Sequence, residues 1–204
     1  MKRFLAAAIA VFCLSIPAFA EDAPWSAATS YPTDIVIGSE KAPVTVVEYA
    51  SLTCPHCGRF HKESWPDFKK LWIDTGKAKL VYRHLPLDQS ALAGALTAAC
   101  APADRRADFI SELFASVAEW APSQDMAPVL KKVYGDSVKI EDVMACISVK
   151  GFPEEVMQPA TDAVNHGVSA TPTFFVNGTK LEGFKTAEEL GRIVDDKLAE
   201  EILQ

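Results

Sequence analysis

Two cysteines, Cys54 and Cys57, are separated by only two residues, a spacing at which two sulfurs can share a disulfide or one metal ion. Residues 44–50 before them form a β-branched, nearly continuous apolar run, which is typical of a buried strand. A helical pattern follows the pair and continues through Trp72. The two cysteines are therefore expected where a strand gives way to a helix.

This position has chemical consequences for Cys54. At the start of a helix, unpaired backbone N–H groups and the positive end of the helix dipole point at the sulfur, and both favour the thiolate. His56 adds a hydrogen-bond donor, and Pro55 stiffens the turn. A stabilised thiolate makes the disulfide easier to donate. We therefore expect Cys54 to be the exposed, reactive sulfur and Cys57 to be the shielded, resolving thiol.

Other uses of a Cys-x-x-Cys pair fit the sequence less well. A structural zinc site needs a second pair of ligands at close spacing, but Cys100 and Cys146 lie far apart in the chain. His61, four residues after Cys57, could share a helix face with it, although a solvated surface histidine is the expected role. Covalent haem attachment requires a histidine where Gly58 stands. We therefore predict no metal or other cofactor, and a purely structural short disulfide remains as an alternative.

Residues 1–20 have the pattern of a secretory signal peptide. The basic start Lys2-Arg3 precedes an apolar run, and Ala18-Phe19-Ala20 matches the small-x-small pattern of a cleavage site. The run is too short to span a bilayer comfortably. We therefore expect export with cleavage after Ala20, followed by a flexible lead-in over residues 21–33.

Cleavage would remove Cys13 and leave four cysteines, for which three pairings exist. Export places the chain where disulfides persist. Cys100 and Cys146 lie near the ends of separate helical segments, so we predict that they form a structural disulfide. Two buried free thiols are the alternative.

The charge of the chain limits its partners. The formal net charge is −7, and loss of two basic residues with the signal peptide would make it more negative. No cluster of Lys or Arg offsets this acidity, so we expect binding neither to nucleic acid nor to anionic lipid. The hydrophobic fraction of 49% is enough for a core that does not depend on disulfides.

The remaining pattern predicts one α/β domain interrupted by helices. Residues 34–37 form a candidate edge strand, and residues 79–85 form a candidate strand parallel to 44–50, because a helix connects the two. Residues 88–165 are helical in pattern and contain no expected strand. We therefore assign 34–87 together with 166–204 to the α/β domain and 88–165 to an inserted helical domain.

Local motifs refine these elements. Residues 173–176 and 179–181 flank Asn177-Gly178, which strongly predicts a two-residue hairpin. The last helix starts at Thr186, and Glu189 three residues later completes a capping box. Its buried face is expected to contain five apolar residues: Leu190, Ile193, Val194, Leu198 and Ile202.

The helix after the cysteines also has an apolar face. At helical spacing, Phe60, Phe68, Leu71 and Trp72 should share it. Pro66 stands inside this pattern and should kink the helix.

Residues 37–203 resemble the DsbA-type thiol–disulfide oxidoreductases, and residues 54–57 match the active-site tetrapeptide of that family residue for residue. The resemblance implies a thioredoxin-like fold with an inserted α-helical domain. It also implies that Thr171-Pro172 is a cis-proline loop facing the cysteines, which could pair with a substrate strand. Glu48 matches the buried acid that assists proton transfer at the shielded cysteine. A trans Pro172 and a surface-exposed Glu48 are the alternatives.

The resemblance further implies a disulfide donor of the periplasm. Its partners would be reduced substrate proteins or peptides and a membrane partner of the DsbB type that reoxidises it, and we expect a monomer. Thr171 stands where strongly oxidising members often carry Val, and Thr there also occurs in isomerase-type relatives. A disulfide isomerase or reductase is therefore the alternative within the class. A peptide-binding or chaperone module with a structural Cys-x-x-Cys pair is the alternative outside it.

Overall fold

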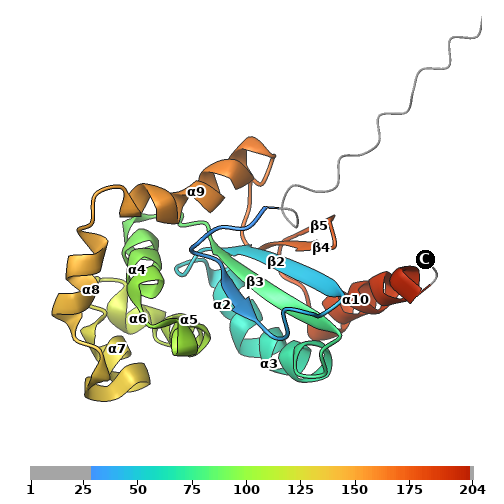
Figure 1. Ribbon diagram of the computed structural model, residues 1–204, viewed down its shortest axis with the longest axis horizontal. Coiled ribbons are helices and arrows are strands. Elements are labelled where there is room, and N and C mark those ends of the chain that lie inside the picture. Colours follow the sequence, from blue (N-terminus) through green and yellow to red (C-terminus); the bar gives the residue numbers. More distant parts are fainter. Residues whose placement is uncertain (1–28, 203–204) are drawn as a thin grey trace, which may run out of the picture.

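The computed structural model describes residues 29–202 (Figure 1). The predicted signal peptide, its cleavage site after Ala20 and residues 21–28 of the lead-in lie outside this range. A mixed five-stranded sheet forms the centre, and its strands in spatial order are β1 (Ile35–Ile37), β3 (Ala78–His84), β2 (Val44–Ala50), β4 (Thr173–Val176) and β5 (Thr179–Glu182). Strands β2 and β3 are parallel, and the other neighbours are antiparallel. The predicted edge strand, parallel pair and hairpin are confirmed.

The helix after the cysteines widens to a π-helical turn at two places. It consists of two α-helical segments, each followed by a π-helical turn: α2 (Pro55–Arg59), η1 (Phe60–Ser64), α3 (Trp65–Phe68) and η2 (Lys69–Ile73). Pro66 lies in the first turn of α3, directly after a π-helical turn, where a missing N–H is tolerated.

The predicted apolar face of this helix is wrong at one position. Phe60 and Phe68 are fully buried, and Trp72 is nearly so, but Leu71 is 49% exposed. The physical reason is the wider turn of η2, in which each residue advances the chain by a smaller angle than in an α-helix. Spacing counted at 3.6 residues per turn therefore fails there.

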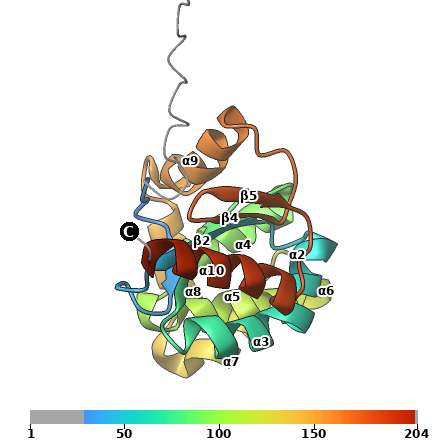
Figure 2. The same cartoon turned by 90° about the vertical axis from the view of Figure 1, so that its right-hand side faces the viewer.

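Helices cover both faces of the sheet. On one face, α3 and η2 pack with α10 (Ala187–Ile202) around Phe68, Trp72, Leu190 and Val194. On the other face, α9 (Phe152–Asn165) packs through Ala160 and Ala163. Figure 2 shows α9 and α10 on opposite sides of the strands.

Residues 88–165, all within the described part of the chain, contain helices and no strand, as predicted. Besides α9, these helices are α4 (Gln89–Cys100), η3 (Ala103–Arg105), α5 (Arg106–Ala115), α6 (Val117–Trp120), α7 (Ala127–Tyr134), η4 (Gly135–Ser137) and α8 (Ile140–Ile147). Their shared core includes Phe109, Leu113, Trp120 and Leu130. From α4 to α8 they gather beside the sheet in Figure 1, whereas α9 continues from them onto the sheet.

Two local motifs have the predicted geometry. Asn177 and Gly178 both have positive φ angles, 39° and 93°, as a tight hairpin turn requires. At the start of α10, the backbone N–H of Glu189 donates to the hydroxyl of Thr186, and the backbone N–H of Thr186 donates to the Glu189 carboxylate. These reciprocal bonds are the capping box.

The described end of the predicted flexible lead-in is held against the fold. The hydroxyl of Tyr31 donates to the carboxylate of Asp162 on α9 at 2.7 Å. Asp34 accepts two bonds from the buried guanidinium of Arg83, at 2.8 and 2.9 Å. Residues 29–33 are therefore in contact with the domain. Within residues 29–202, no helix is long and apolar enough to cross a membrane.

Candidate active site

Cys54 occupies the position just before the first turn of α2. Its backbone is extended, with φ −73° and ψ 122°, and Pro55 begins the helix behind it. The backbone N–H of Gly58 donates to the Cys54 carbonyl at 3.0 Å, which closes the first turn. The sulfur is thus held at the helix start. The expectation that Cys54 is exposed is wrong, because the residue is only 9% exposed and packs into the core that includes the inserted helices.

The strand order brings a second loop to this sulfur. β4 runs antiparallel to β2, with Thr173 beside Tyr49, so the residues before β4 lie beyond the end of β2 that leads to Cys54. The Thr171–Pro172 peptide bond there is cis. Cys54 Sγ lies 3.3 Å from the carbonyl oxygen of Thr171, to which its thiol form donates.

The surroundings of Cys54 favour its thiolate. A hydrogen bond from the Cys57 thiol, the side chain of Thr171 and the backbone N–H groups of Cys57 and His56 together outweigh burial and lower the pKa of Cys54 to about 5. The Thr171 hydroxyl is buried and makes no hydrogen bond to another residue within the described part of the chain. This sulfur is a thiolate at neutral pH.

Cys57 is in the opposite situation. It is fully buried. Burial, the hydrogen bond with Cys54 and the negative charge of Glu48 all raise the pKa of the Cys57 thiol far above its ordinary value. The two sulfurs of one short motif therefore differ in protonation throughout the physiological range.

Glu48 lies in the middle of β2 and is fully buried. Its two carboxylate oxygens are 3.2 and 3.1 Å from Nε2 of His61, whose side chain is 4% exposed. The expectation that His61 is a solvated surface histidine is therefore wrong. His61 precedes the buried Trp65 by four residues, a spacing that is compatible with a buried position but does not require one.

Aromatic rings enclose the Glu48–His61 pair. The imidazole stacks on Phe114 of α5, with ring centroids 4.1 Å apart, and meets the edge of Tyr82 of β3 at 6.0 Å. Nδ1 of His61 and the hydroxyl of Tyr82 have no hydrogen-bond partner within the described residues. Because both side chains are buried, hydrogen bonding between them satisfies polar atoms that water does not reach.

The other two residues of the motif are exposed. The side chains of Pro55 and His56 face solvent, and the His56 imidazole makes no hydrogen bond within the part of the chain described. His56 acts on Cys54 through its backbone N–H.

A cleft of about 600 Å³ opens beside Cys54, between the helix start and the inserted helices. Leu52, Pro55, His61, Phe114 and Val117 contribute to its walls. The cleft could receive an apolar side chain of a peptide whose cysteine meets Cys54.

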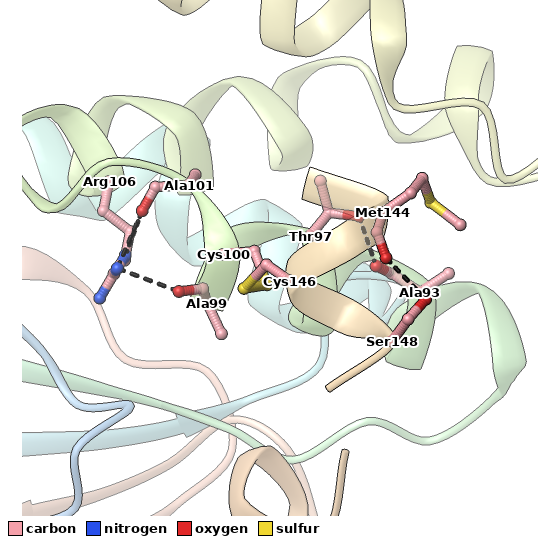
Figure 3. Close-up of a disulfide and its surroundings, with 9 residues drawn as sticks. All are labelled: Ala93, Thr97, Ala99, Cys100, Ala101, Arg106, Met144, Cys146 and Ser148. Atoms are coloured by element: carbon pink, nitrogen blue, oxygen red, sulfur yellow. Dashed lines mark hydrogen bonds between the residues drawn. A yellow bond between two sulfur atoms is a disulfide. The ribbon is translucent and has the colours of Figure 1, made fainter. Parts of the chain in front are cut away.

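Cys100 and Cys146 form a disulfide away from this site (Figure 3). The bond connects the last residue of α4 to α8, with Cα atoms 6.0 Å apart. Beside it, the guanidinium of Arg106 donates to the carbonyl oxygens of Ala99 and Ala101 at the end of α4. Among the described residues, no group of three or more His, Cys, Asp or Glu side chains is arranged to hold a metal ion.

Comparisons with known proteins agree with this architecture. A family model described as thioredoxin matches residues 30–196. The structure of Wolbachia pipientis alpha-DsbA1 superposes with a TM-score of 0.75 and 28% identity, covering 85% of this chain and 95% of that one. BdbD from Bacillus subtilis superposes with a TM-score of 0.73 over 83% of this chain and 95% of that one, and at 24% identity this likeness concerns the fold alone.

A curated relative from Rickettsia typhi, whose name assigns it provisionally to the protein-disulfide oxidoreductases, is 30% identical over 172 residues. The match covers 82% of this chain and 63% of the relative. The chain thus spans about three fifths of the length of this and the similarly named Rickettsia relatives.

The chain belongs to the thioredoxin family. Within it, the chain is similar to the DsbA proteins, and the predicted thioredoxin-like fold with inserted helices is confirmed.

Proposed function

We propose that the protein is an exported thiol–disulfide oxidoreductase that donates the disulfide between Cys54 and Cys57 to reduced proteins. The observation that carries this proposal is the opposite shift of the two thiols. The pKa of Cys54 is lowered to about 5, and that of Cys57 is raised. The names of the DsbA relatives support the same chemistry.

The reaction consists of two thiol–disulfide exchanges. A substrate thiolate attacks Cys54 Sγ, the bond between Cys54 and Cys57 breaks, and Cys57 leaves and takes up a proton. A second substrate thiolate then attacks the substrate sulfur of the mixed disulfide, and Cys54 leaves as a thiolate. The substrate loses two electrons and the Cys54–Cys57 pair gains them.

The lowered pKa of Cys54 provides the driving force for donating the disulfide. With a pKa of about 5, ionisation at pH 7 stabilises the reduced form by about 3 kcal/mol relative to an un-ionised thiol. For a two-electron couple, this corresponds to a reduction potential higher by roughly 60 mV. The disulfide is therefore donated more readily than one between ordinary thiols.

The neighbouring residues have supporting roles in this proposal. Pro55 and His56 shape the helix start, and Glu48 handles the proton of Cys57. Thr171 and Pro172 form the loop beside Cys54 that offers its backbone to a substrate strand. Export to the periplasm and reoxidation by a DsbB-type membrane partner complete the proposed cycle.

Oxidation of a reduced peptide with two cysteines tests the function. Cys54→Ser should abolish catalysis, because no sulfur remains to be attacked. Cys57→Ser mixed with oxidised glutathione should accumulate a Cys54–glutathione mixed disulfide, detectable by intact mass, because the Cys54 thiolate attacks the glutathione disulfide, one glutathione thiolate leaves, and no Cys57 thiol is present to break the new bond. A Cys54→Ser variant as active as the unchanged protein would support a binding module with a structural disulfide instead.

The threonine before Pro172 favours a second candidate, a disulfide isomerase or reductase with the same site. Equilibration with reduced and oxidised glutathione distinguishes the two. A donor should be readily reduced by glutathione, whereas a pair that stays oxidised against a large excess of glutathione would favour the second candidate.

A further inference from the structure

Two regions of the surface border Cys54, and a substrate whose cysteine reaches this sulfur must contact them. One is the Thr171–Pro172 loop, whose Thr171 carbonyl oxygen is 3.3 Å from Cys54 Sγ. The other is the cleft of about 600 Å³, to whose wall Cys54 itself contributes. Among the described residues, those of the loop do not line the cleft, so the cleft is a second place for a substrate to bind.

The inner wall of the cleft is apolar. Leu52 is 2% exposed, and Phe114 of α5 is 6% exposed. Val117 of α6 is half-buried beside them. Ala115, the last residue of α5, is exposed, and its small side chain leaves that part of the wall without bulk. A cleft of this size with buried apolar side chains in its wall is suited to an apolar group.

The charged residues of the cleft wall are Arg59, Lys62 and Glu63. Arg59 and Glu63 form an ion pair at 2.9 Å, and the guanidinium of Arg59 also lies over the ring of Phe184, 4.0 Å from its centroid. Lys62 is exposed and forms no ion pair with any residue in the part of the chain that the structure describes. The exposed rim of the cleft therefore carries an uncompensated positive charge, on a chain whose formal net charge is −7.

The cleft is within reach of the residues that flank a substrate cysteine. An extended peptide advances by about 3.3 Å per residue, so a residue two positions from the cysteine is displaced by about 7 Å along the peptide. When the cysteine is bonded to Cys54, side chains over this length of peptide can enter a cleft whose wall includes Cys54.

We propose that this cleft is a substrate subsite. It takes a large apolar side chain from a residue within two positions of the reacting cysteine, and Lys62 favours an acidic residue beside that side chain. The protein then reacts fastest with cysteines in segments that combine an aromatic or long aliphatic residue with Asp or Glu. This inference rests on the proposed function and adds the class of substrate to it.

Oxidation of short dithiol peptides tests the apolar part. One cysteine of each peptide is flanked by glycine and serine, and the other by alanines, which are replaced by phenylalanine one position at a time. Oxidised protein is mixed with excess peptide, samples are quenched with acid, and intact mass after alkylation follows the reduction of the Cys54–Cys57 disulfide. Phenylalanine in at least one position should raise the rate constant by roughly tenfold, as expected for filling an apolar pocket. Equal rate constants for alanine and phenylalanine at every position would overturn the proposal.

Filling the cleft should remove this preference. Ala115→Phe puts a ring into the wall, so the rate constants of the phenylalanine and alanine peptides should become similar. Ala118→Phe is the matched control, because Ala118 is exposed on α6 and lies outside the cleft, and it should keep the preference. Ser111→Phe, one turn earlier on α5, fills the cleft from a second position. A preference that survives in folded Ala115→Phe and Ser111→Phe would overturn the proposal.

The charge of Lys62 is tested with peptides that carry Glu or Gln beside the phenylalanine. The Glu-to-Gln rate ratio of the unchanged protein is divided by that of Lys62→Gln, which cancels the effect of glutamate on the peptide's own thiol. This quotient should be about two to five at low salt, as for an exposed ion pair, and should approach one at high salt. Lys70→Gln, which changes an exposed lysine of η2 outside the cleft, should leave the ratio unchanged. A quotient of one at low salt would reject the role of Lys62.

The subsite and the proposed function can fail separately. Failure of the unchanged protein to oxidise any of the peptides would reject the function. Oxidation of all the peptides at one rate would reject only the subsite.

Discussion

At the scale of single residues, the proposed disulfide exchange depends on two cysteine side chains in different electrostatic surroundings. Cys54 receives hydrogen bonds from the Cys57 thiol and from backbone N–H groups at a helix start, and its pKa falls to about 5. Cys57, one turn further on, loses its hydration and faces the charge of Glu48, so its pKa rises. The reduced motif therefore contains one thiolate and one thiol, and the proposed disulfide donation depends on this difference.

This asymmetry predicts how the stability of the reduced protein depends on pH. The folded pKa of Cys54 lies below its ordinary value of 9.0, so its contribution is complete above pH 9 and is lost as the pH falls toward 5. Within that window, the free energy of unfolding should rise by about 1.4 kcal/mol per pH unit from this group. Urea unfolding of reduced protein and reduced Cys54→Ser at several pH values measures the difference. If the free energy of unfolding of the two reduced proteins changed with pH in the same way, the lowered pKa of Cys54 would be contradicted.

Sequence alone could predict which sulfur would lie at the helix start, because the strand-to-helix junction around Cys54 is encoded locally. It could not place His61. The spacing that puts this histidine on the buried face of the helix also fits a surface position, and only the packing of Phe114 over the ring decides between them. Distant contacts of this kind leave no local pattern.

At the scale of elements, the long helix after the cysteines packs closely against α10. Gly191 of α10 lies against the indole of Trp72, and a Cβ added there would be 2.0 Å from the ring. The indole N–H also donates to Asp195 of α10 at 3.1 Å. The absence of a side chain at Gly191 therefore permits this contact, although glycine is a poor helix former.

Two glycine substitutions should have opposite effects on stability. Gly191→Ala should lower the free energy of unfolding, because overpacking costs about 1–3 kcal/mol and exceeds the gain in helix propensity at such a short distance. Gly58→Ala, in α2, meets nothing within 4 Å and should raise it by up to about 1 kcal/mol. Urea denaturation midpoints in one redox state provide the comparison. A stabilised Gly191→Ala variant would show that the two helices are not this close.

A turn or helix end can be predicted from the sequence when neighbouring residues in the chain specify it. The hairpin at Asn177-Gly178 and the capping box at Thr186 are specified by neighbouring residues, and both have the expected form. The winding of η2 is not specified by neighbouring residues, because this turn packs against the sheet and α10. Leu71 was therefore placed on the wrong side.

At the scale of the whole molecule, the helices inserted between β3 and β4 share their core with the active site. The same cluster of buried side chains contains Cys54 and Cys57 as well as Phe109 and Leu113 of α5. The element order predicted such an insertion. It could not show that α9 continues from the insertion onto the sheet, since this depends on where Ala160 and Ala163 come to lie.

The disulfide between Cys100 and Cys146 should stabilise this helical part without taking part in catalysis. It closes a loop with a sequence separation of 46, for which chain entropy gives roughly 4 kcal/mol as an upper value. Cys100→Ala/Cys146→Ala should therefore lower the free energy of unfolding by up to that amount and still oxidise the test peptide at 25 °C. Loss of peptide oxidation in a folded double variant would assign this disulfide a redox role.

The central claim is that the surroundings of Cys54 make it a thiolate at neutral pH, and the pH dependence of its alkylation tests this most directly. Reduced protein is treated briefly with iodoacetamide across a range of pH, and mass spectrometry of peptides assigns the label to Cys54. The rate should follow ionisation with a midpoint at about pH 5. A midpoint near the ordinary value of 9.0 would contradict the account.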